Sequence, residues 1–592
     1  MKKSFILTLL TIITLGLFRP VTALAEEQKL PSGTDRDKID QKIQDFVKEH
    51  EKTTAGMETA IFDKNGTIYQ GNFGYMNKEK GIKADDDSVF EWGSVTKLTI
   101  WVSVMQLWEQ GKINLEEDIR TYLPEGFLKN LRYDKPITML DLMSHQAGFD
   151  EVTMYLQDDK SIEEILKEQQ PIQSFEPGTV TAYSNYGAGL AALIVERISG
   201  QTFADYAHEH IFQPLGMDKT AILPDLSDNS YVQKKRQETK GYDTKGNLLS
   251  KDRFITSIYP IGAATGTLKD LEKFAQALLA RKTLFERPET WNTLYTASST
   301  YPDTDIIRNA HGFWANEYGT TVLGHGGNTA GATSRIMLDL EHGIGYVVMT
   351  NQGTEQNYNF QMPELVFGPR KTASKETKEQ FSPGYYRTLR NFNQGPLAIF
   401  KMIPASADYL QEPSDDQRLP NNFWTIYQSQ GKTRIAVAVA DYEKVSDFDF
   451  FKDYVVLGLA GLGIIYALGL LIISPLLGVY RLIFRKKQDQ PDRTWKVWNL
   501  LTAVGILTVP INLFLLFMSA TSGDFSEIAQ WRYMLFAALG LLLTTAALLP
   551  LFRKFREKLS KGRLFLTSVT SLSALAVAAN ILYWSLYQWW VF

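Results

Sequence analysis

The chain has 592 residues, too many for one ordinary domain, and its 62 basic and 66 acidic side chains give a net charge of −4. Residues 451–592 hold 14 of the basic and 6 of the acidic side chains, so the larger N-terminal part is acidic. An acidic surface argues against nucleic acid as a partner. The absence of cysteine excludes disulfides, lipid-modified cysteines and thiolate metal sites.

Residues 1–25 have the pattern of a secretory signal peptide. Two lysines precede a long apolar run, and the small-residue sequence Ala23-Leu24-Ala25 follows it. We expect cleavage after Ala25, with an uncleaved membrane anchor as the alternative. Either outcome exports the segment that follows.

Residues 35–369 are predicted to form an α+β domain. The turn signal Lys64-Asn65-Gly66 predicts a hairpin over 59–77, and apolar residues at helical spacing predict a helix from Ser94 to Gly111. Further helices are expected at 35–53, 137–145, 186–199 and 268–281, and further strands at 321–327, 334–343 and 344–352. Hairpins and terminal strands around a helical group favour an antiparallel sheet flanked by helices.

Residues 370–450 are predicted to contain a linker and a small membrane-proximal β element. Residues 370–390 are charged and rich in turn formers, which is typical of a linker. Residues 391–450 hold too many aromatic and β-branched side chains to be disordered, so we expect strands there.

Residues 451–592 are predicted to form an all-α transmembrane bundle of four spans. Four uncharged stretches are long enough to cross a hydrocarbon core of roughly 30 Å, and they cover 454–480, 497–523, 533–552 and 564–592. Basic residues gather in the connections 481–496 and 553–563, which the positive-inside rule places in the cytoplasm. The preceding domain would then lie on the outer face of the cell membrane.

Ser94 and Lys97 stand three residues apart at the predicted start of a helix. A serine hydroxyl is a poor nucleophile without a nearby proton acceptor. Residues i and i+3 share a helix face, so the Lys97 amine can reach the Ser94 oxygen. Burial and the positive end of the helix dipole both disfavour a charged lysine, which would make it a usable base. A solvated pair on an exposed helix is the alternative.

Two further motifs accompany this pair. Tyr183-Ser184-Asn185 precedes a predicted helix, and His325-Gly326-Gly327 ends a predicted strand. Each pattern is weak alone. The serine–lysine spacing recurs at Ser429 and Lys432 in a polar turn, and the Tyr-x-Asn pattern recurs at Tyr75-Met76-Asn77. We interpret both repeats as chance matches.

The three motifs in this order resemble those of the serine β-lactamase and penicillin-binding enzymes, in particular the class C β-lactamase, D-Ala-D-Ala carboxypeptidase and esterase branch. The resemblance covers about residues 40–355 and extends to the stretches "ITMLDLMSHQAGF", "FQPLGM" and "GAATGTLKDLEKFAQALL". It implies the antiparallel sheet and flanking helices of that fold, and an acyl-enzyme mechanism without a cofactor.

The resemblance implies catalytic roles for three side chains. Ser94 would be the acylated nucleophile, and Lys97 its base or base partner. Tyr183 would be the shared acid/base that activates Ser94 and protonates the leaving group. The backbone N–H groups of Ser94 and Asn328 would form the oxyanion hole.

The resemblance also implies substrate-binding roles. Asn185 would hold the substrate amide, and Gly326 and Gly327 would let the strand backbone approach the substrate closely. His325 stands where β-lactamases have a lysine. This difference puts strong recognition of a substrate carboxylate in doubt, because a neutral histidine offers one donor and no fixed charge.

Other candidate residues have simpler interpretations. The histidines of His208-Glu209-His210 do not share a helix face, so a solvated helix end is expected there rather than a metal site. Asp85-Asp86-Asp87 lacks the rest of a calcium-loop pattern and is expected to form a turn. His145 is expected to cap or pack. The sequence therefore implies no metal.

The predicted function is that of a membrane-anchored, extracytoplasmic serine hydrolase acting on D-amino-acid-bearing peptides or esters of the cell envelope. The architecture also resembles peptidases that remove an acyl-D-asparagine prodrug motif from exported natural products. A third hypothesis is a binding or sensing module without turnover, against which the short cytoplasmic connections argue. The expected partners are this substrate and membrane lipid, and the oligomeric state is left open.

Overall fold

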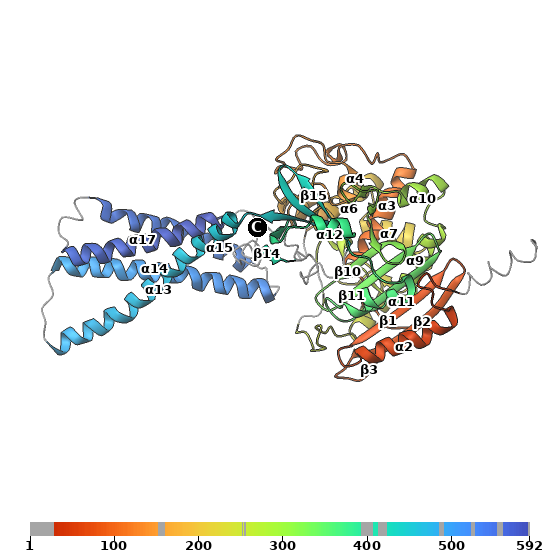
Figure 1. Ribbon diagram of the computed structural model, residues 1–592, viewed down its shortest axis with the longest axis horizontal. Helices are drawn as coiled ribbons and strands as arrows, with labels where there is room; N and C mark the ends of the chain where they lie inside the picture. The colour runs from red at the N-terminus through yellow and green to blue at the C-terminus, as the bar shows by residue number, and fades with distance from the viewer. Residues whose placement is uncertain are drawn as a thin grey trace, which may run out of the picture.

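The computed structural model describes residues 29–151, 160–250, 253, 256–391, 407–411, 423–484, 490–522, 527–552 and 560–589. The predicted signal peptide lies outside these residues. Figure 1 shows two parts: a broad α+β part and an elongated helical bundle that extends from one side of it.

The α+β part is built on a nine-stranded antiparallel sheet in the order β3-β2-β1-β12-β11-β10-β9-β8-β7. Its strands are β1 (Gly56–Asp63), β2 (Gly66–Asn77), β3 (Ile82–Lys83), β7 (Ser299–Thr300), β8 (Ile307–Ala310), β9 (Phe313–Glu317), β10 (Thr321–Asn328), β11 (Thr333–Asp339) and β12 (Ile344–Thr350). Met57 of β1 lies opposite Thr350 of β12, so the N-terminal hairpin extends the sheet that the later strands form. The predicted antiparallel sheet with flanking helices is confirmed.

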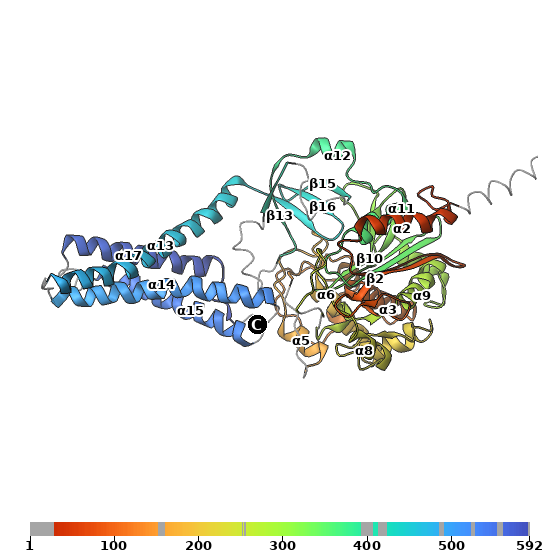
Figure 2. The same cartoon turned by 90° about the horizontal axis from the view of Figure 1, so that it is seen from below.

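Helices cover both faces of this sheet (Figure 2). On one face, α2 (Ile39–His50) buries Ile39, Ile43 and Val47, which share a helix stripe because they are four residues apart. This stripe packs in one apolar cluster with residues of α11 (Glu364–Phe367). The opposite face carries the larger apolar cluster, to which α3 (Lys97–Glu109), α6 (Asn185–Ser199) and α9 (Leu268–Ala280) contribute.

Helix α3 is the central helix of that larger cluster. All its residues from Lys97 to Leu107 are buried, the polar ones included, so no side of this stretch faces solvent. The predicted helix from Ser94 to Gly111 begins instead with a 3₁₀ turn, η2 (Gly93–Thr96), and α3 ends at Glu109. The backbone therefore places Ser94 in the 3₁₀ turn and Lys97 at the first position of the buried helix.

The remaining helices of the α+β part are mostly short. They are η1 (Arg36–Lys38), η3 (Ile119–Thr121), α4 (Met139–Met143), α5 (Ile162–Glu168), α7 (Phe203–Ala207), η4 (His208–Phe212), α8 (Ser230–Arg236), η5 (Tyr259–Ile261), α10 (Pro288–Tyr295) and η6 (Asn357–Gln361). A small sheet joins β4 (Phe90–Glu91), β6 (Thr265–Gly266) and β5 (Thr220–Ala221). This small sheet fixes the chain just before η2, because Trp92 N donates to the Ala264 carbonyl at 2.7 Å.

A second antiparallel sheet follows the nine-stranded one in sequence. Its order is β14-β13-β17-β16-β15, with β13 (Gly384–Thr388), β14 (Ala407–Leu410), β15 (Trp424–Ser429), β16 (Lys432–Val437) and β17 (Asp441–Val445). The segment predicted as a linker, 370–390, contains α12 (Lys375–Gln380) and β13, and β13 pairs with both β14 and β17. Strand β13 of the predicted linker is therefore part of this sheet.

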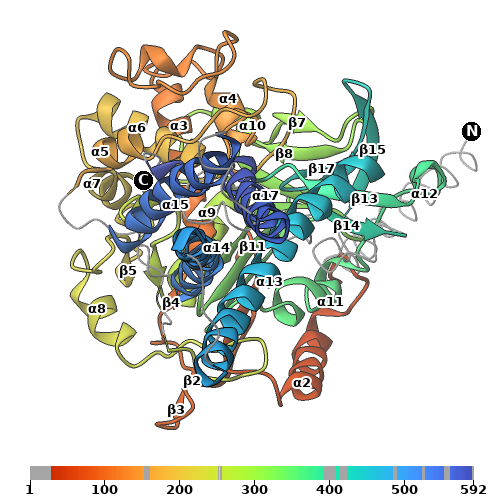
Figure 3. The ribbon, with the colours of Figure 1, turned by 90° about the vertical axis from the view of Figure 1, so that its left-hand side faces the viewer.

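The bundle consists of α13 (Asp447–Ile483), α14 (Gln490–Ser522), α15 (Glu527–Leu548) with the short η10 (Leu549–Leu551), and α17 (Lys561–Tyr583). Four helices are long and apolar enough to cross a membrane: Asp447–Ile483, Thr494–Met518, Trp531–Leu551 and Lys561–Tyr583. The last of them ends at Tyr583, before the end of the predicted stretch 564–592. Figure 3 views the bundle from its far end, with the α+β part behind it.

The first bundle helix continues directly from the second sheet. The rings of Tyr385 and Phe450 stack with their centroids 3.5 Å apart. Arg387 of β13 forms an ion pair of 3.1 Å with Asp453 of α13. The second sheet therefore contacts the start of the first candidate span through both apolar and charged side chains.

Candidate active site

The predicted site residues gather around one cleft of about 410 Å³. The nine-stranded sheet, η2, the start of α6 and the second sheet all contribute to it. Its lining includes Gly93, Ser94, Tyr183, Asn185, His325, Gly326, Asn328, Arg335, Arg390 and residues 437–440. Of the predicted site residues, Lys97 and Gly327 are buried beside this lining.

Ser94 reaches the cleft because η2 and the end of β10 approach each other at two glycines. Gly93 adopts a left-handed φ of +51°, and a Cβ atom there would lie 2.7 Å from Asn328 N. A Cβ atom at Gly327 would overlap the Trp92 carbonyl oxygen and lie 3.0 Å from Ser94 N. The backbone nitrogens of Ser94 and Asn328 therefore lie on neighbouring segments at the same end of the cleft.

Lys97 lies beneath Ser94 in the core. Its Nζ is 3.1 Å from Ser94 Oγ and donates to the Ile261 carbonyl at 2.6 Å. Burial lowers the pKa of Lys97 to about 7, an effect that Glu151 opposes and Arg390 reinforces. A neutral amine can donate to Ile261 and accept the Ser94 proton at the same time, so this geometry suits a general base.

Tyr183 stands beside this pair. The Lys97 Nζ atom is 5.1 Å from the centre of the Tyr183 ring. Burial raises the pKa of Tyr183 well above its usual range, while the Ser94 hydroxyl and the Arg390 guanidinium oppose that rise. Tyr183 is therefore a protonated phenol at neutral pH, and its buried hydroxyl interacts with the Ser94 hydroxyl.

Two further rings hold Tyr183 in place. The His145 ring stacks on Tyr183 with the ring centres 4.1 Å apart, and the Trp314 ring centre lies 5.4 Å from that of His145 and 6.4 Å from that of Tyr183. Ser184 N donates to His145 Nδ1 at 3.0 Å. Burial keeps the pKa of His145 well below its usual range, so this ring is neutral. The prediction that His145 packs agrees with this position, but the sequence did not place it against Tyr183.

Asn185 is held from the side by a carboxylate. Its backbone N donates to Glu151 Oε1 at 3.2 Å, and its side-chain Nδ2 donates to Glu151 Oε2 at 3.3 Å. Arg390 completes this group, because its Nη2 forms an ion pair of 2.7 Å with Glu151 Oε2. Sequence reasoning missed Glu151 and Arg390, which lie 239 residues apart.

His325 differs from the sequence expectation in one respect. Its Nδ1 lies 2.7 Å from the Gly326 carbonyl oxygen, so Nδ1 carries the proton and donates to that oxygen. Burial lowers the pKa of His325 to about 3, which keeps the ring neutral. The remaining nitrogen, Nε2, is then an acceptor. The Nδ1–H group is the one donor that a neutral His325 has, and it is bonded to the Gly326 carbonyl within β10 rather than available to a substrate.

Arg335 of β11 is a second cation in the cleft that sequence reasoning missed. It lies opposite Gly326 in the sheet, and a Cβ atom at Gly326 would be 3.1 Å from Arg335 Nη2. Arg335 is 8% exposed, packs 3.8 Å over the Phe360 ring, and its Nε has no hydrogen-bond partner in the described part of the chain. The signal that could have found Arg335 is that it is the single basic residue of the predicted strand sequence 334–340.

The serine–lysine repeat lies outside the site. Ser429 and Lys432 face each other across the β15–β16 turn. Ser429 Oγ accepts from Arg434 Nη1 at 3.1 Å, and Lys432 Nζ forms an ion pair of 2.5 Å with Glu443. Both side chains are engaged elsewhere, which agrees with a chance match.

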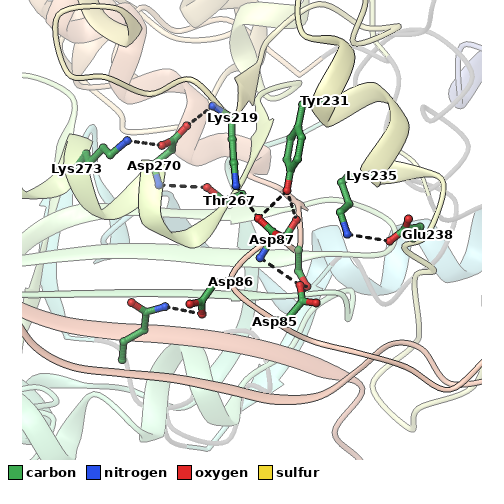
Figure 4. Close-up of polar contacts among 12 residues, drawn as sticks. Asp85, Asp86, Asp87, Lys219, Tyr231, Lys235, Glu238, Thr267, Asp270 and Lys273 are labelled. Atoms are coloured by element: carbon green, nitrogen blue, oxygen red, sulfur yellow. Dashed lines mark hydrogen bonds and ion pairs between the residues drawn. The ribbon is translucent and has the colours of Figure 1, made fainter.

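The other candidates also have structural partners. His208 Nε2 lies 2.8 Å from Asp228 Oδ2. Asp87 accepts from Lys219 Nζ at 2.6 Å and from the Tyr231 hydroxyl at 2.9 Å, while Asp85 accepts from the Asp87 backbone N at 3.1 Å (Figure 4). The residues that the structure describes contain no group of three or more histidine, aspartate or glutamate side chains that could hold a metal ion.

Comparison with known proteins finds relatives named for penicillin binding and for hydrolysis of D-alanine from teichoic acid. The penicillin-binding protein PbpX of Bacillus subtilis is 27% identical over 288 residues, which cover 47% of this chain and 67% of that protein. The teichoic acid D-alanine hydrolase of Staphylococcus aureus is 25% identical over 275 residues, or 45% of this chain and 66% of the relative. The matches thus span about two thirds of these relatives.

The solved structure of the D-amino acid amidase from Ochrobactrum anthropi aligns with 56% of this chain and 97% of its own, at 22% identity and a TM-score of 0.47. The family model described as Beta-lactamase matches residues 39–367, which is more than half of the chain. This match includes Ser94, Lys97, Tyr183 and the His325 strand. The chain belongs to the Beta-lactamase family.

Proposed function

We propose that this chain is a membrane-anchored, extracytoplasmic serine hydrolase that forms an acyl-enzyme with D-amino-acid-bearing peptides or esters of the cell envelope. The observation that carries the proposal is the pairing of Ser94 with Lys97. A fully buried lysine whose Nζ lies 3.1 Å from a serine oxygen is a proton acceptor in reach of a nucleophile.

The acylation step follows from these positions. As Ser94 Oγ bonds to the substrate carbonyl carbon, its proton passes to neutral Lys97. The oxyanion of the tetrahedral intermediate is held by the N–H groups of Ser94 and Asn328. Tyr183 protonates the leaving amine or alcohol and regains a proton from Lys97, while the bond to the leaving group breaks. Water then releases the acyl group from Ser94 by the reverse proton transfers.

Two observations support an anionic substrate of the D-alanyl class. The Arg335 guanidinium lines the cleft and has no ion-pair partner among the described residues, so it is available to a carboxylate or phosphate of the substrate. It supplies the fixed charge that His325 lacks. One relative is named for hydrolysis of D-alanine from teichoic acid and another for penicillin binding, and both names fit D-alanyl substrates.

The bundle supports a location at the membrane. Its four candidate spans present many large apolar side chains on their outer surface, such as Leu462, Ile465, Leu541 and Leu572, which suits contact with lipid. The basic connections favour a cytoplasmic position for the two loops, and therefore an outer position for the cleft.

A labelling experiment on the detergent-solubilised full chain tests the proposal. A fluorescent penicillin or fluorophosphonate should label the wild type and the Ser429→Ala control but not Ser94→Ala. The wild type should also release D-alanine from a D-alanyl ester or a D-alanyl-D-alanine peptide, and Arg335→Leu should lose more activity on an anionic than on a neutral substrate. Labelling that survives Ser94→Ala contradicts the proposal. Labelling without release would favour the binding or sensing module.

A further inference from the structure

The second sheet forms a wall of the cleft although it lies outside the matched region 39–367. Residues 437–440 and Tyr442 line the cleft together with Ser94 and Tyr183. The contact runs along the backbone of the catalytic tyrosine itself: Tyr183 N donates to the Val439 carbonyl at 3.1 Å. In the same stretch, Asp441 N donates to the Thr181 carbonyl at 2.8 Å.

Arg390, which follows β13 of this sheet, reaches the centre of the site. Its Nη2 and Nε lie 2.7 and 3.2 Å from Glu151 Oε2, and the Glu151 side chain is only 1% exposed. Glu151 in turn binds Asn185. The Arg390 guanidinium also lies over the Tyr183 ring, with its central carbon 4.8 Å from the ring centre.

We propose that Arg390 is a positioning residue of the active site, supplied by the second sheet, which holds the Glu151–Asn185 pair and Tyr183 and keeps a positive charge near Lys97. The proposal rests on the serine-hydrolase function above. In this view the second sheet is part of the catalytic unit as well as the connection to the bundle.

The electrostatic consequence concerns the protonation of Lys97. Arg390 lowers the pKa of Lys97, and Glu151 raises it. Replacing Arg390 by a neutral residue removes the first effect and leaves Glu151 without its ion pair to Arg390, so both changes raise the pKa of Lys97. More lysine is then protonated at neutral pH, and less base is available.

The other ionisable groups that face Lys97 do not cancel this effect. Burial lowers the pKa of His145 and His325 and raises that of Tyr183, so all three are neutral near pH 7. Among the described residues, the ionisable groups that interact with Lys97 are Glu151, Arg390, Tyr183, His145 and His325, and the last three are neutral near pH 7.

The test compares pH profiles of Ser94 acylation by a fluorescent penicillin or fluorophosphonate in the detergent-solubilised full chain. Arg390→Gln should lower the acylation rate at pH 7 and move the acidic limb of the profile to higher pH by at least about 0.5 pH unit. Arg390→Lys should return the limb toward its wild-type position, because it keeps the charge. Arg387→Gln is the matched control, since Arg387 lies on β13 three residues before Arg390 but pairs with Asp453 of α13.

Thermal unfolding of each variant shows whether it has folded. The deciding quantity is the pH of the acidic limb of the acylation profile, because this pH does not depend on the amount of folded protein. A limb that stays at the wild-type pH in Arg390→Gln overturns the inference, as does an Arg390→Lys limb displaced as far as that of Arg390→Gln. If the wild type itself shows no labelling that depends on Ser94, the proposed function fails instead. The two failures are therefore distinguishable.

Discussion

Arg308 of β8 and Asp441 of β17 form an ion pair of 2.7 Å, and each side chain is 2% exposed. The pair joins the nine-stranded sheet to the second sheet. Asp441 also accepts from Thr181 N at 2.9 Å and from the Tyr427 hydroxyl at 2.8 Å. These bonds hold the wall of the cleft against the segment that carries Tyr183.

Breaking this pair should destabilise the protein strongly. Removing one partner leaves a buried charge without compensation, which costs about 3–5 kcal/mol. Arg308→Met should therefore lower the thermal unfolding temperature of the solubilised chain far more than Arg120→Gln, since Arg120 pairs with Asp118 at the surface and such pairs contribute about 1 kcal/mol or less. Equal effects of the two substitutions would mean that Arg308 is not needed to hold the second sheet.

The pH dependence of acylation should follow Lys97. Because burial lowers the pKa of Lys97 to about 7, the amine is protonated and inactive as a base below that pH and becomes neutral above it. Acylation of Ser94 should fall as the pH drops below about 7. In Glu151→Gln the acidic limb should move to lower pH, because Glu151 raises the pKa of Lys97. A limb that moves the other way would show that a different group controls the step.

The base and the acid should both be needed for acylation. Lys97→Ala and Tyr183→Phe should each reduce the labelling rate by at least about a hundredfold, the usual scale for a positioned acid or base. A time course of labelling with the same fluorescent penicillin measures this rate. A loss below about tenfold for Tyr183→Phe would assign the proton transfer to Lys97 alone.

Two neighbouring glycines should respond differently to alanine. At Gly327 a methyl group would overlap the Trp92 carbonyl oxygen and displace the turn that holds Ser94, and a misplacement of about 1 Å can cost about 10²-fold in rate. At Gly326 the methyl group meets the end of the flexible Arg335 side chain at 3.1 Å. Acylation should therefore fall much more in Gly327→Ala than in Gly326→Ala. The reverse order would contradict the close approach of η2 and β10.

The absence of native cysteine allows a direct test of topology. A cysteine introduced at Ser227 in the α+β part should react with a membrane-impermeant maleimide in intact cells. Cysteines introduced at Gln488 and Lys558, in the two basic connections, should react only after the membrane is permeabilised. Labelling of Gln488→Cys from outside the cell would overturn the proposed orientation.

The sequence by itself determined much of the fold and pointed to the pair Ser94 and Lys97 that we propose as nucleophile and base. Apolar periodicity located α3, α6 and α9, and long uncharged stretches located the four candidate spans, because these signals are local in the chain. The serine and lysine one helical turn apart were readable for the same reason. The 3₁₀ turn that precedes α3 and the end of the last span at Tyr583 could not be read from the sequence, because the ends of elements depend on tertiary contacts.

Tertiary structure alone decided what surrounds that pair. Glu151 and Arg390 are 239 residues apart and no local pattern joins them, yet together they hold Asn185 and Tyr183. The second sheet becomes a wall of the cleft through backbone bonds to the segment that carries Tyr183 and through the Arg308–Asp441 ion pair. The low pKa of Lys97 likewise depends on complete burial, because desolvation of the amine comes from side chains that folding brings from many parts of the chain.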